Sequence, residues 1–231
     1  MYLLIDIGNS RDKATLADKG KITPLPQLTA ENVAKLPLQA VYFSSVASPE
    51  RALQLRQKLE LEHIPWRQVH SEPKAFGVTS SYQQSGLLGV DRWLLLLGSQ
   101  LKYPSQTLMI VDAGTAVTVD WLAADGIHLG GWILPGLRLQ QQAVVKNTAK
   151  VFNSEAIKAR LEPGQETVAC LQNGCLAAVT GAIQQGWQLG LADNVILTGG
   201  DSIYLKPHLS HLPLIADPLL LFYGLARYID N

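Results

Sequence analysis

The chain has 231 residues, of which 47% are hydrophobic and 16% are charged, so it can form complete hydrophobic cores and is not of the disordered class. Its 19 basic and 19 acidic residues cancel, and the absence of a long basic run excludes the charge pattern of a typical nucleic-acid binder. Its longest apolar runs are far too short to span a bilayer. We therefore expect one large domain or two smaller ones, without nucleic acid or membrane as a partner.

The cysteines and the start of the chain favour the cytoplasm. Cys170 and Cys175 have a spacing that fits neither a redox motif nor a zinc site. Both lie in an apolar helical pattern, which predicts buried thiols in a reducing compartment. The first residues show neither the basic segment nor the cleavage site of a secretory signal. We therefore expect a cytoplasmic protein.

Two short stretches of the chain resemble each other. Residues 4–10 read LIDIGNS and residues 110–116 read IVDAGTA, and an interval of 106 residues separates both their Asp residues and their Gly residues. The same interval relates Leu16-Ala17 to Leu122-Ala123. An apolar run that ends in Asp-x-Gly is typical of a strand entering a tight turn.

The residues after each stretch predict a β-hairpin. Residues 13–22 and 117–128 each read as a strand, a turn and a return. Two such units suggest a duplicated domain with a cleft between the copies. Tyr103-Pro104-Ser105 marks the boundary, so we expect an N-terminal domain of residues 1–104 and a C-terminal domain of residues 105–231.

The remaining pattern of the N-terminal half predicts alternating strands and helices. Residues 40–46 and 66–69 read as strands, and residues 49–61 between them read as an amphipathic helix, which together fit a right-handed βαβ unit. Residues 71–90 form a long irregular stretch, and such loops are often functional. An apolar helix then begins near Asp91.

The C-terminal half predicts a similar set of elements. The expected strands cover residues 130–137, 194–198 and 213–216, and the expected helices cover residues 138–160 with a break near Asn147 or Asn153, 168–191 and 218–229. The Gly130–Leu137 strand ends in a Pro-Gly turn, and the strand at 194–198 leads into a Thr-Gly-Gly-Asp turn.

The glycine turns suit a phosphate ligand. Glycine lets the backbone approach the ligand closely, and successive N–H groups with the Asn9, Ser10 or Thr115 side chains can donate to phosphate oxygens. Asp at a strand end can hold a cation that neutralises those oxygens. Either turn alone is better explained as an ordinary hairpin, but their repetition favours the functional interpretation. Lys13 could reach a phosphate or could be a solvated strand residue.

Two further segments allow both a structural and a functional interpretation. Asp91 in the first turn of a helix is favoured by the helix dipole alone, whereas Asp91 with Arg92 could also be a base and an anion clamp. The turn of residues 198–201 could admit an adenine or a ribose against bare backbone, although Gly-Gly is also common in plain loops.

Taken together, these motifs resemble type III pantothenate kinases, members of the superfamily of acetate kinase, sugar kinases, heat-shock chaperone ATPases and actin. The matching motifs are Asp6-x-Gly-Asn-Ser-x-x-Lys13, Tyr82 with Leu88-Gly-x-Asp-Arg92, Asp112-x-Gly-Thr-Ala116, Gly130-Gly-x-Ile-x-Pro-Gly136 and Thr198-Gly-Gly-Asp201. The resemblance covers nearly the whole chain. It implies an α/β fold of duplicated actin-like or ribonuclease H-like domains, each with a mixed sheet and flanking helices.

The resemblance also implies a role for each motif. The residues implied to bind ATP are Asp6, Ile7, Gly8, Asn9, Ser10, Arg11, Asp12, Lys13 and Thr115, with Thr198, Gly199, Gly200 and Asp201 as the adenosine motif. Those implied to bind pantothenate are Tyr82, Gly89, Val90, Asp91 and Arg92, with Asp91 as the catalytic base, and Thr167 from the partner subunit of a homodimer. Asp6 would lie near Mg²⁺ and the phosphates, and Asp112 would bind a monovalent cation, K⁺ or NH₄⁺.

The implied activity is ATP-dependent phosphorylation of pantothenate to 4'-phosphopantothenate, the first step of coenzyme A biosynthesis. Two positions depart from the family pattern: Ser85 stands where proline is usual, and Ser10 stands where threonine is usual. Two other interpretations stay open. The chain could be a non-catalytic accessory homologue that affects transcription, or a kinase for another hydroxylated acceptor.

Overall fold

The computed structural model describes residues 1–8, 11–152, 154 and 157–229, and the chain divides into two compact units. Unit 1 contains Met1–Ser105, Asp125–His128 and Leu219–Asn231, and unit 2 contains Gln106–Ala124 and Leu129–Pro218. The chain enters unit 2 beside the expected boundary, but a short turn and the last helix return to unit 1. Each unit is described by itself below.

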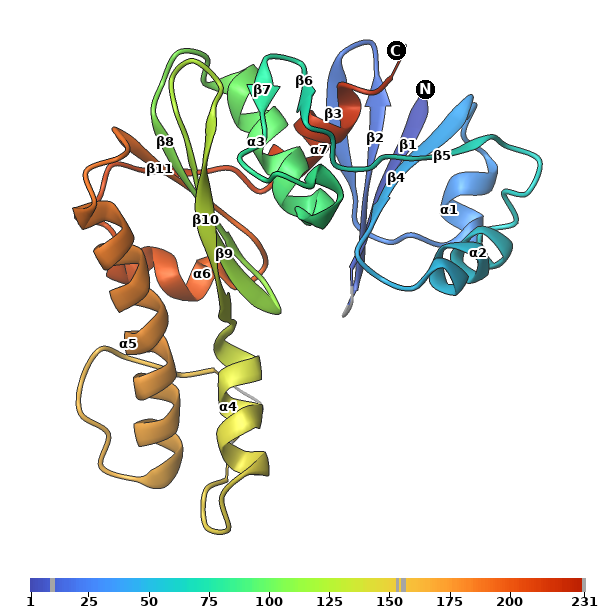
Figure 1. Cartoon of the computed structure of the whole chain (residues 1–231). Coiled ribbons are helices and arrows are strands. Elements are labelled where there is room, and N and C mark those ends of the chain that lie inside the picture. The colour runs from blue at the N-terminus through green and yellow to red at the C-terminus, as the bar shows by residue number, and fades with distance from the viewer. Residues whose placement is uncertain (9–10, 153, 155–156, 230–231) are drawn as a thin grey trace. The chain divides into compact units, whose positions relative to one another are not determined.

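Unit 1 is built on a five-stranded mixed sheet with the strand order β3-β2-β1-β4-β5 (Figure 1). The strands are β1 (Tyr2–Ile7), β2 (Asp12–Asp18), β3 (Lys21–Leu25), β4 (Ala40–Ser45) and β5 (Trp66–Gln68). Strand β1 pairs antiparallel with β2 and parallel with β4. Helices α1 (Ala30–Ala34) and α2 (Pro49–Lys58) cover one face of the sheet, as the βαβ pattern predicts.

The alternation of side chains along β1 and β4 decides what each face carries. Leu3, Ile5 and Ile7 of β1 pack in a cluster with Leu55 and Leu59 around α2. Because successive side chains of a strand point to opposite faces, Asp6 lies on the other face, which packs against α3 (Val90–Lys102) and α7 (Leu220–Ala226). The Asp6 carboxylate, the one carboxylate of β1, therefore lies on the face of the sheet that α3 covers.

Between β5 and α3 the chain forms the segment that we call the acceptor loop, residues 71–89. It contains the short strands β6 (Lys74–Ala75) and β7 (Val78–Thr79) and the 3₁₀ turn η1 (Ser85–Leu87). The Ser71 hydroxyl donates to the Leu88 carbonyl over 2.7 Å, which ties the two ends of the loop together. The expected long irregular stretch is thus an ordered loop that leads directly into α3.

Helices α3 and α7 cross at two glycines. A Cβ atom on Gly98 would lie 2.1 Å from the Leu220 carbonyl oxygen, and one on Gly224 would lie 1.9 Å from the Leu94 carbonyl oxygen. Only residues without a Cβ allow the two backbones to approach so closely. This contact is the physical reason why the last helix belongs to unit 1 rather than to unit 2.

Unit 2 repeats the sheet of unit 1, with the strand order β10-β9-β8-β11-β12 (Figure 1). The strands are β8 (Leu108–Ala113), β9 (Ala116–Leu122), β10 (His128–Pro135), β11 (Asn194–Thr198) and β12 (Leu214–Ala216). The helical segments are α4 (Leu137–Lys146), α5 (Thr167–Gln188), α6 (Ser202–Leu205) and the 3₁₀ turn η2 (Lys206–His208). Leu176, Val179 and Ile183 of α5 pack on the sheet and form the core of the unit.

The two hairpins are equivalent, but their turns differ in length. Asp6 pairs with Lys13 across β1 and β2, whereas Asp112 pairs with Thr118 across β8 and β9. The interval between equivalent residues is therefore 106 in the first strand and 105 in the second. The match of Leu16 to Leu122 in the sequence is wrong by one residue, because the second turn is one residue shorter.

Two other expectations are corrected by the structure. The helix expected over residues 138–160 does break at one of the two expected places, because the Asn147 and Thr148 side chains bind carbonyl groups of its last turn, but the described residues from 148 to 160 form no further helix. Cys175 is buried, but Cys170 is exposed, since it lies in the first turns of α5, before the buried part of that helix begins. In the described part of the chain no helix combines the length and the hydrophobicity that crossing a bilayer requires.

Candidate functional site

Asp6 is a buried carboxylate at the end of β1. Its side chain is 9% exposed, and its Oδ1 accepts a hydrogen bond of 3.0 Å from the Ser44 hydroxyl on β4. Burial raises the pKa of Asp6, and the nearby Asp91 and Asp12 carboxylates raise it further, while Lys13 and the Ser44 hydrogen bond oppose the shift. The negative charge of Asp6 is therefore only partly compensated within unit 1.

The turn after β1 is held from both sides. A Cβ on Gly8 would lie 2.8 Å from the Arg11 carbonyl oxygen, so the turn closes tightly on its glycine. The Asp12 carboxylate accepts a hydrogen bond of 3.1 Å from Arg51 of α2. Lys13 lies opposite Asp6 in the strand register. Of the residues expected to bind ATP here, Asn9 and Ser10 lie outside the described residues.

Asp91 lies in the first turn of α3, next to the N-cap Gly89. Its Oδ1 accepts a hydrogen bond of 2.8 Å from the Arg92 backbone N–H. A Cβ on Gly89 would lie 2.5 Å from that oxygen, so the glycine leaves room for the carboxylate. Asp91 is half-buried, and its charge acts on Asp6. Asp91 thus has the position at the start of a helix that the helix dipole favours. Its carboxylate also lies on the same side of the sheet as Asp6.

The structure brings Tyr82 and Arg92 together. The Arg92 Nη1 donates to the Tyr82 hydroxyl over 2.9 Å, and the guanidinium carbon lies 5.7 Å from the centre of the Tyr82 ring. Arg92 is 3% exposed, whereas Tyr82 is half-buried. Val90 is buried. Ser85, which replaces the usual proline, begins η1 between these residues.

In unit 2 three glycine turns meet at the end of β8. A Cβ on Gly136 would lie 2.2 Å from the Gly114 carbonyl oxygen, so the Pro-Gly turn packs on the turn that carries Thr115. Gly199 has a positive φ of 91°, and its Cβ would lie 2.4 Å from the Asp112 Oδ1. The expected second phosphate motif and the expected adenosine motif are therefore adjacent within this unit.

The adenosine motif is fixed to β8 by its backbone. The Asp201 N–H donates to the Ala113 carbonyl oxygen over 2.9 Å, and Thr198 pairs with Asp112 across β11 and β8. Thr198 is 5% exposed, and Gly200 is exposed. The turn thus places the Gly199-Gly200 backbone beside the end of β8.

Thr167 is the first residue of α5 and is exposed. No residue of that helix is buried before Gln172. Figure 1 shows the beginning of α5 and the end of α4 extending away from the sheet of unit 2. This position leaves Thr167 accessible to another molecule.

Three residues beside these groups were not expected from the sequence. They are Ser44, which binds Asp6, Arg51, which binds Asp12, and His128, which contacts Tyr82. A signal existed for Ser44, because the polar Ser44-Ser45 ends an otherwise apolar strand next to β1. The sequence gives no comparable signal for Arg51 or His128, since both contacts depend on tertiary structure.

The donor set determines which cation could fit. In the described ranges no group of three His, Cys, Asp or Glu side chains could hold a metal by protein ligands alone. Asp6 is instead a single buried carboxylate with a raised pKa. Mg²⁺ is often bound by one or two carboxylates together with substrate phosphates, and Asp6 fits that arrangement. Asp112 offers a carboxylate oxygen beside bare backbone, which fits a hard monovalent cation equally well.

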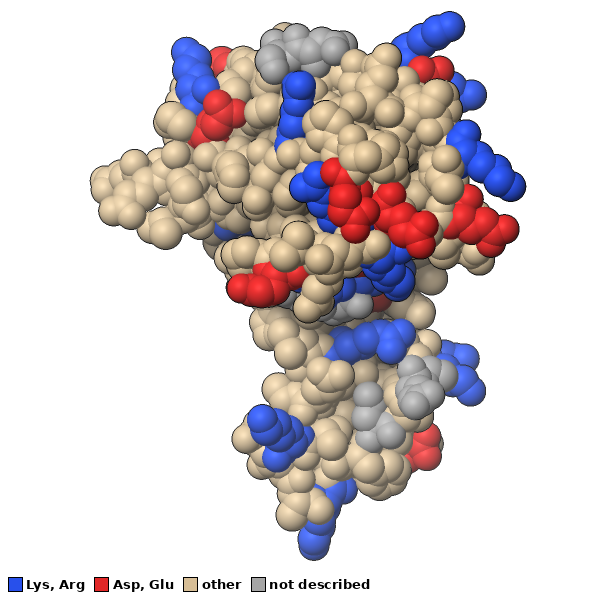
Figure 2. Space-filling model, turned by 90° about the vertical axis from the view of Figure 1, so that its right-hand side faces the viewer, with Lys and Arg blue, Asp and Glu red and all other residues tan. Residues whose placement is uncertain are grey.

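On the face drawn in Figure 2, Lys and Arg side chains are interspersed with Asp and Glu. This agrees with the balance of 19 basic and 19 acidic residues in the sequence.

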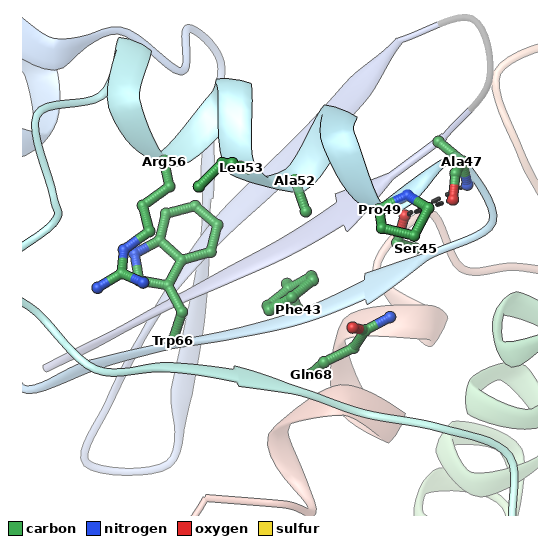
Figure 3. Close-up of a pocket in the computed structure, with 9 residues that line it drawn as sticks. All are labelled: Phe43, Ser45, Ala47, Pro49, Ala52, Leu53, Arg56, Trp66 and Gln68. Atoms are coloured by element: carbon green, nitrogen blue, oxygen red, sulfur yellow. Dashed lines mark hydrogen bonds between the residues drawn. The ribbon is translucent and has the colours of Figure 1, made fainter.

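A pocket of about 360 Å³ lies between α2 and the end of the sheet of unit 1 (Figure 3). Its lining residues are Phe43, Ser45, Ala47, Pro49, Ala52, Leu53, Arg56, Trp66 and Gln68. Arg56 and Trp66 lie at one end, and Ser45 and Pro49 lie at the other. None of the expected site residues lines this pocket, so it is not the site described above.

Comparison with known proteins identifies the family. Residues 2–188 match the family model of type III pantothenate kinase. A type III pantothenate kinase of Colwellia psychrerythraea is 39% identical over 87% of this chain and 85% of its own length. A type III pantothenate kinase of Pseudoalteromonas translucida is 35% identical over 100% of this chain and 97% of its own length.

Solved structures share the fold of the whole chain. A protein from Campylobacter jejuni, described as a Baf family transcriptional activator, has a TM-score of 0.63 and 26% identity, and the match covers 98% of this chain and 96% of that one. The activator of 2-hydroxyisocaproyl-CoA dehydratase from Clostridium difficile, with bound ADPNP, has a TM-score of 0.54 and 12% identity over 98% and 93% of the chains. Two sheets of one strand order thus form the expected duplicated actin-like fold, and the chain belongs to the type III pantothenate kinase family.

Proposed function

We propose that Asp91 is the general base in the reaction of this chain, which is the ATP-dependent phosphorylation of pantothenate that begins coenzyme A biosynthesis. In this reaction the terminal hydroxyl oxygen of pantothenate bonds to the γ-phosphorus of ATP, and the bond from that phosphorus to the bridging oxygen breaks. ADP leaves with that oxygen, and Asp91 accepts the hydroxyl proton. The observation that carries this role is the position of Asp91 on the Asp6 side of α3, beside Arg92.

The nucleotide is held by the glycine turns. The backbone of the turn from Gly8, the Lys13 ammonium and Thr115 would bind the phosphates, and Thr198–Asp201 would contact the adenosine. Asp6 would hold Mg²⁺, which neutralises charge on the transferred phosphoryl group when it is bound with ATP. The only partly compensated charge of buried Asp6 supports this role.

The acceptor is oriented by the start of α3 and the acceptor loop. Arg92 is a buried guanidinium that would pair with the pantothenate carboxylate. Tyr82, bound to Arg92, would contact the same end of the substrate, and the backbone of Gly89 and Val90 would line its path. An alcohol loses its proton late in phosphoryl transfer, so the first task of Asp91 is to orient the hydroxyl.

The remaining assignments concern the cation, the assembly and the location. Asp112 would bind K⁺ or NH₄⁺ next to the phosphates. Thr167, exposed at the start of α5, would reach the pantothenate site of the other subunit in a homodimer. We place the protein in the cytoplasm, where its two free thiols would stay reduced.

The test is ADP release from ATP and Mg²⁺, measured with and without pantothenate in potassium and in sodium buffer. We expect turnover that requires pantothenate and is faster in potassium. Equal rates in both buffers would remove the cation role from Asp112 but would leave the kinase activity. No turnover in either buffer, from protein shown to be folded, would contradict the proposed activity.

The same assay separates the two other interpretations. The name of the Campylobacter jejuni structure resembles the non-catalytic alternative, a homologue that affects transcription. Such a protein needs neither Asp91 nor Arg92, yet both are present and placed together. A kinase for a different acceptor would keep the ATP groups and release ADP with another compound from a panel of hydroxylated acids.

A further inference from the structure

The turn between β9 and β10, residues 125–128, packs on the acceptor loop as part of unit 1. The Thr79 N–H donates to the Gly126 carbonyl oxygen over 2.9 Å. A Cβ on Gly126 would lie 2.0 Å from the Gly77 carbonyl oxygen, and Gly126 has a positive φ of 84°. Backbone therefore packs directly on backbone, which fixes the position of the turn relative to the loop.

This turn places the His128 ring against the Tyr82 ring. His128 is 1% exposed, and its Nδ1 shares a hydrogen bond of 3.1 Å with the Ser81 hydroxyl. Its ring is nearly parallel to the Tyr82 ring, with an angle of 10° between the planes and 6.2 Å between the centres. One residue thus contacts two consecutive positions of the acceptor loop, one by a hydrogen bond and one by stacking.

Tyr82 in turn is bound to Arg92. Because the Tyr82 hydroxyl accepts the Arg92 hydrogen bond, its own proton is left to donate in another direction. The direction of that donor depends on the tilt of the Tyr82 ring. His128 supports this ring, while Arg92 is fixed by its burial at the start of α3.

We propose that His128 is a positioning residue of the acceptor site, which holds the Tyr82 ring at the angle that presents its hydroxyl, together with Arg92, to the carboxylate of the acceptor. The inference rests on the proposed function of Tyr82 and Arg92. His128 acts through Tyr82 and takes no part in the proton transfer. Its effect is therefore on the binding of the acceptor rather than on the chemical step.

The test compares three variants by steady-state kinetics. His128→Ala removes both the ring and the hydrogen bond, whereas His128→Phe keeps a ring and removes only the hydrogen bond. Ile127→Ala is the matched control, because Ile127 is in the same turn but is 46% exposed. Each protein is first checked for folding by circular dichroism and a thermal melt.

We expect His128→Ala to raise the KM for pantothenate by roughly tenfold, since misplacement of a binding group by about 1 Å can cost up to ~100-fold. The KM for ATP and kcat should change by less than about threefold, the pattern of an interaction equally strong in the ground and transition states. His128→Phe should recover most of the affinity, and Ile127→Ala should match the wild type. An unchanged KM for pantothenate in His128→Ala, or equal increases in both KM values, would overturn the inference.

A second measurement does not depend on activity. In protein with ¹³C-labelled tyrosine, the Tyr82 ring signal is assigned by its loss in Tyr82→Phe. We expect one sharp Tyr82 signal in the wild type and a shifted or broadened signal in His128→Ala, with Ile127→Ala unchanged. An unaltered signal would contradict the positioning role. If the Tyr82 signal changes in His128→Ala but the wild type has no turnover with pantothenate, only the proposed function is contradicted.

Discussion

At the scale of single residues, the Asp6 carboxylate shows how a proposed cation ligand can oppose stability. Burial raises its pKa above the ordinary value of 3.8, so the folded protein holds this proton more tightly than the unfolded chain does. The contribution of Asp6 to stability therefore falls as the pH rises from about 3.8 through the raised pKa, and this contribution does not change further above it. A bound cation would offset this cost by pairing with the carboxylate.

Asp6→Asn should therefore be more stable than the wild type at pH 7 while losing nearly all kinase activity. The amide keeps the shape of the side chain and the acceptor for Ser44 but carries no charge. Thermal melts between pH 4 and pH 8 would measure the difference, which should shrink toward pH 4, because lower pH favours the protonated carboxyl. If the wild type is more stable than Asp6→Asn at pH 7, the buried Asp6 charge does not destabilise the folded protein.

Asp91→Asn should keep the fold and the affinity for ATP but lower kcat by about 10²- to 10⁴-fold, the usual contribution of a general base. The asparagine still accepts the hydrogen bond from the Arg92 N–H but cannot accept the hydroxyl proton. Nucleotide binding by calorimetry and turnover by ADP release would separate the two effects. Full activity in this variant would remove Asp91 from the mechanism.

At the scale of elements, the crossing of α3 and α7 positions the helix that carries the proposed acceptor site. Helix α3 carries Asp91 and Arg92 in its first turn, and Gly98 further along the helix contacts α7. Beyond α7, the Tyr228 hydroxyl accepts a hydrogen bond of 3.0 Å from the Trp93 Nε1 and donates one of 2.5 Å to the Glu72 carboxylate. The end of the chain thus holds both α3 and the acceptor loop.

Gly224→Ala should destabilise the protein by about 1–3 kcal/mol, because its Cβ would overlap the Leu94 carbonyl oxygen and force the helices apart. Gly181→Ala is the matched control, since a Cβ on Gly181 of α5 would meet no atom within 4 Å. That change should stabilise the helix by up to ~1 kcal/mol. Urea unfolding of both variants gives the comparison, and equal effects would show that the crossing tolerates a methyl group.

At the scale of the whole molecule, the two units divide the proposed site residues. Unit 1 contains Asp6, the proposed base Asp91 and the proposed acceptor groups, and unit 2 contains Asp112, Thr115 and the proposed adenosine motif. The assignment of Thr167 adds a second chain, because it gives this exposed residue a role in the site of a partner. That role requires a stable dimer.

Light scattering should therefore give twice the 25.2 kDa mass of one chain. Thr167→Ala should raise the KM for pantothenate several-fold without a change in this mass, since it removes one hydroxyl contact of about 0.5–1.5 kcal/mol. Thr148→Ala is a suitable control, because Thr148 is also exposed in unit 2 and bonds only within its own helix end. A monomer with full activity would exclude the role of Thr167.

The sequence predicted the features that depend on local pattern. Both hairpins, the βαβ segment and the turns at Gly8, Gly114 and Gly199 follow from apolar alternation and turn residues. Tertiary contacts were not predictable in this way. The helical pattern of α7 does not indicate that this helix contacts Gly98, and the sequence around His128 does not indicate that it contacts Tyr82. Each partner is far away in the sequence. The break expected near Asn147 or Asn153 lies at Asn147, where the side chains of Asn147 and Thr148 bind carbonyl groups of the last turn.

The return of α7 to unit 1 also sets an order for protein synthesis. A ribosome completes β1 to α3 early, but the surface of α3 around Gly98 has no α7 to cover it until the chain has been made through Ala226. Nearly all of unit 2 is completed before that moment. The nascent chain therefore carries an uncovered apolar helix, α3, for most of its translation. A frameshift that alters only α7 would disturb α3 and with it Asp91 and Arg92, which are encoded more than 120 codons upstream.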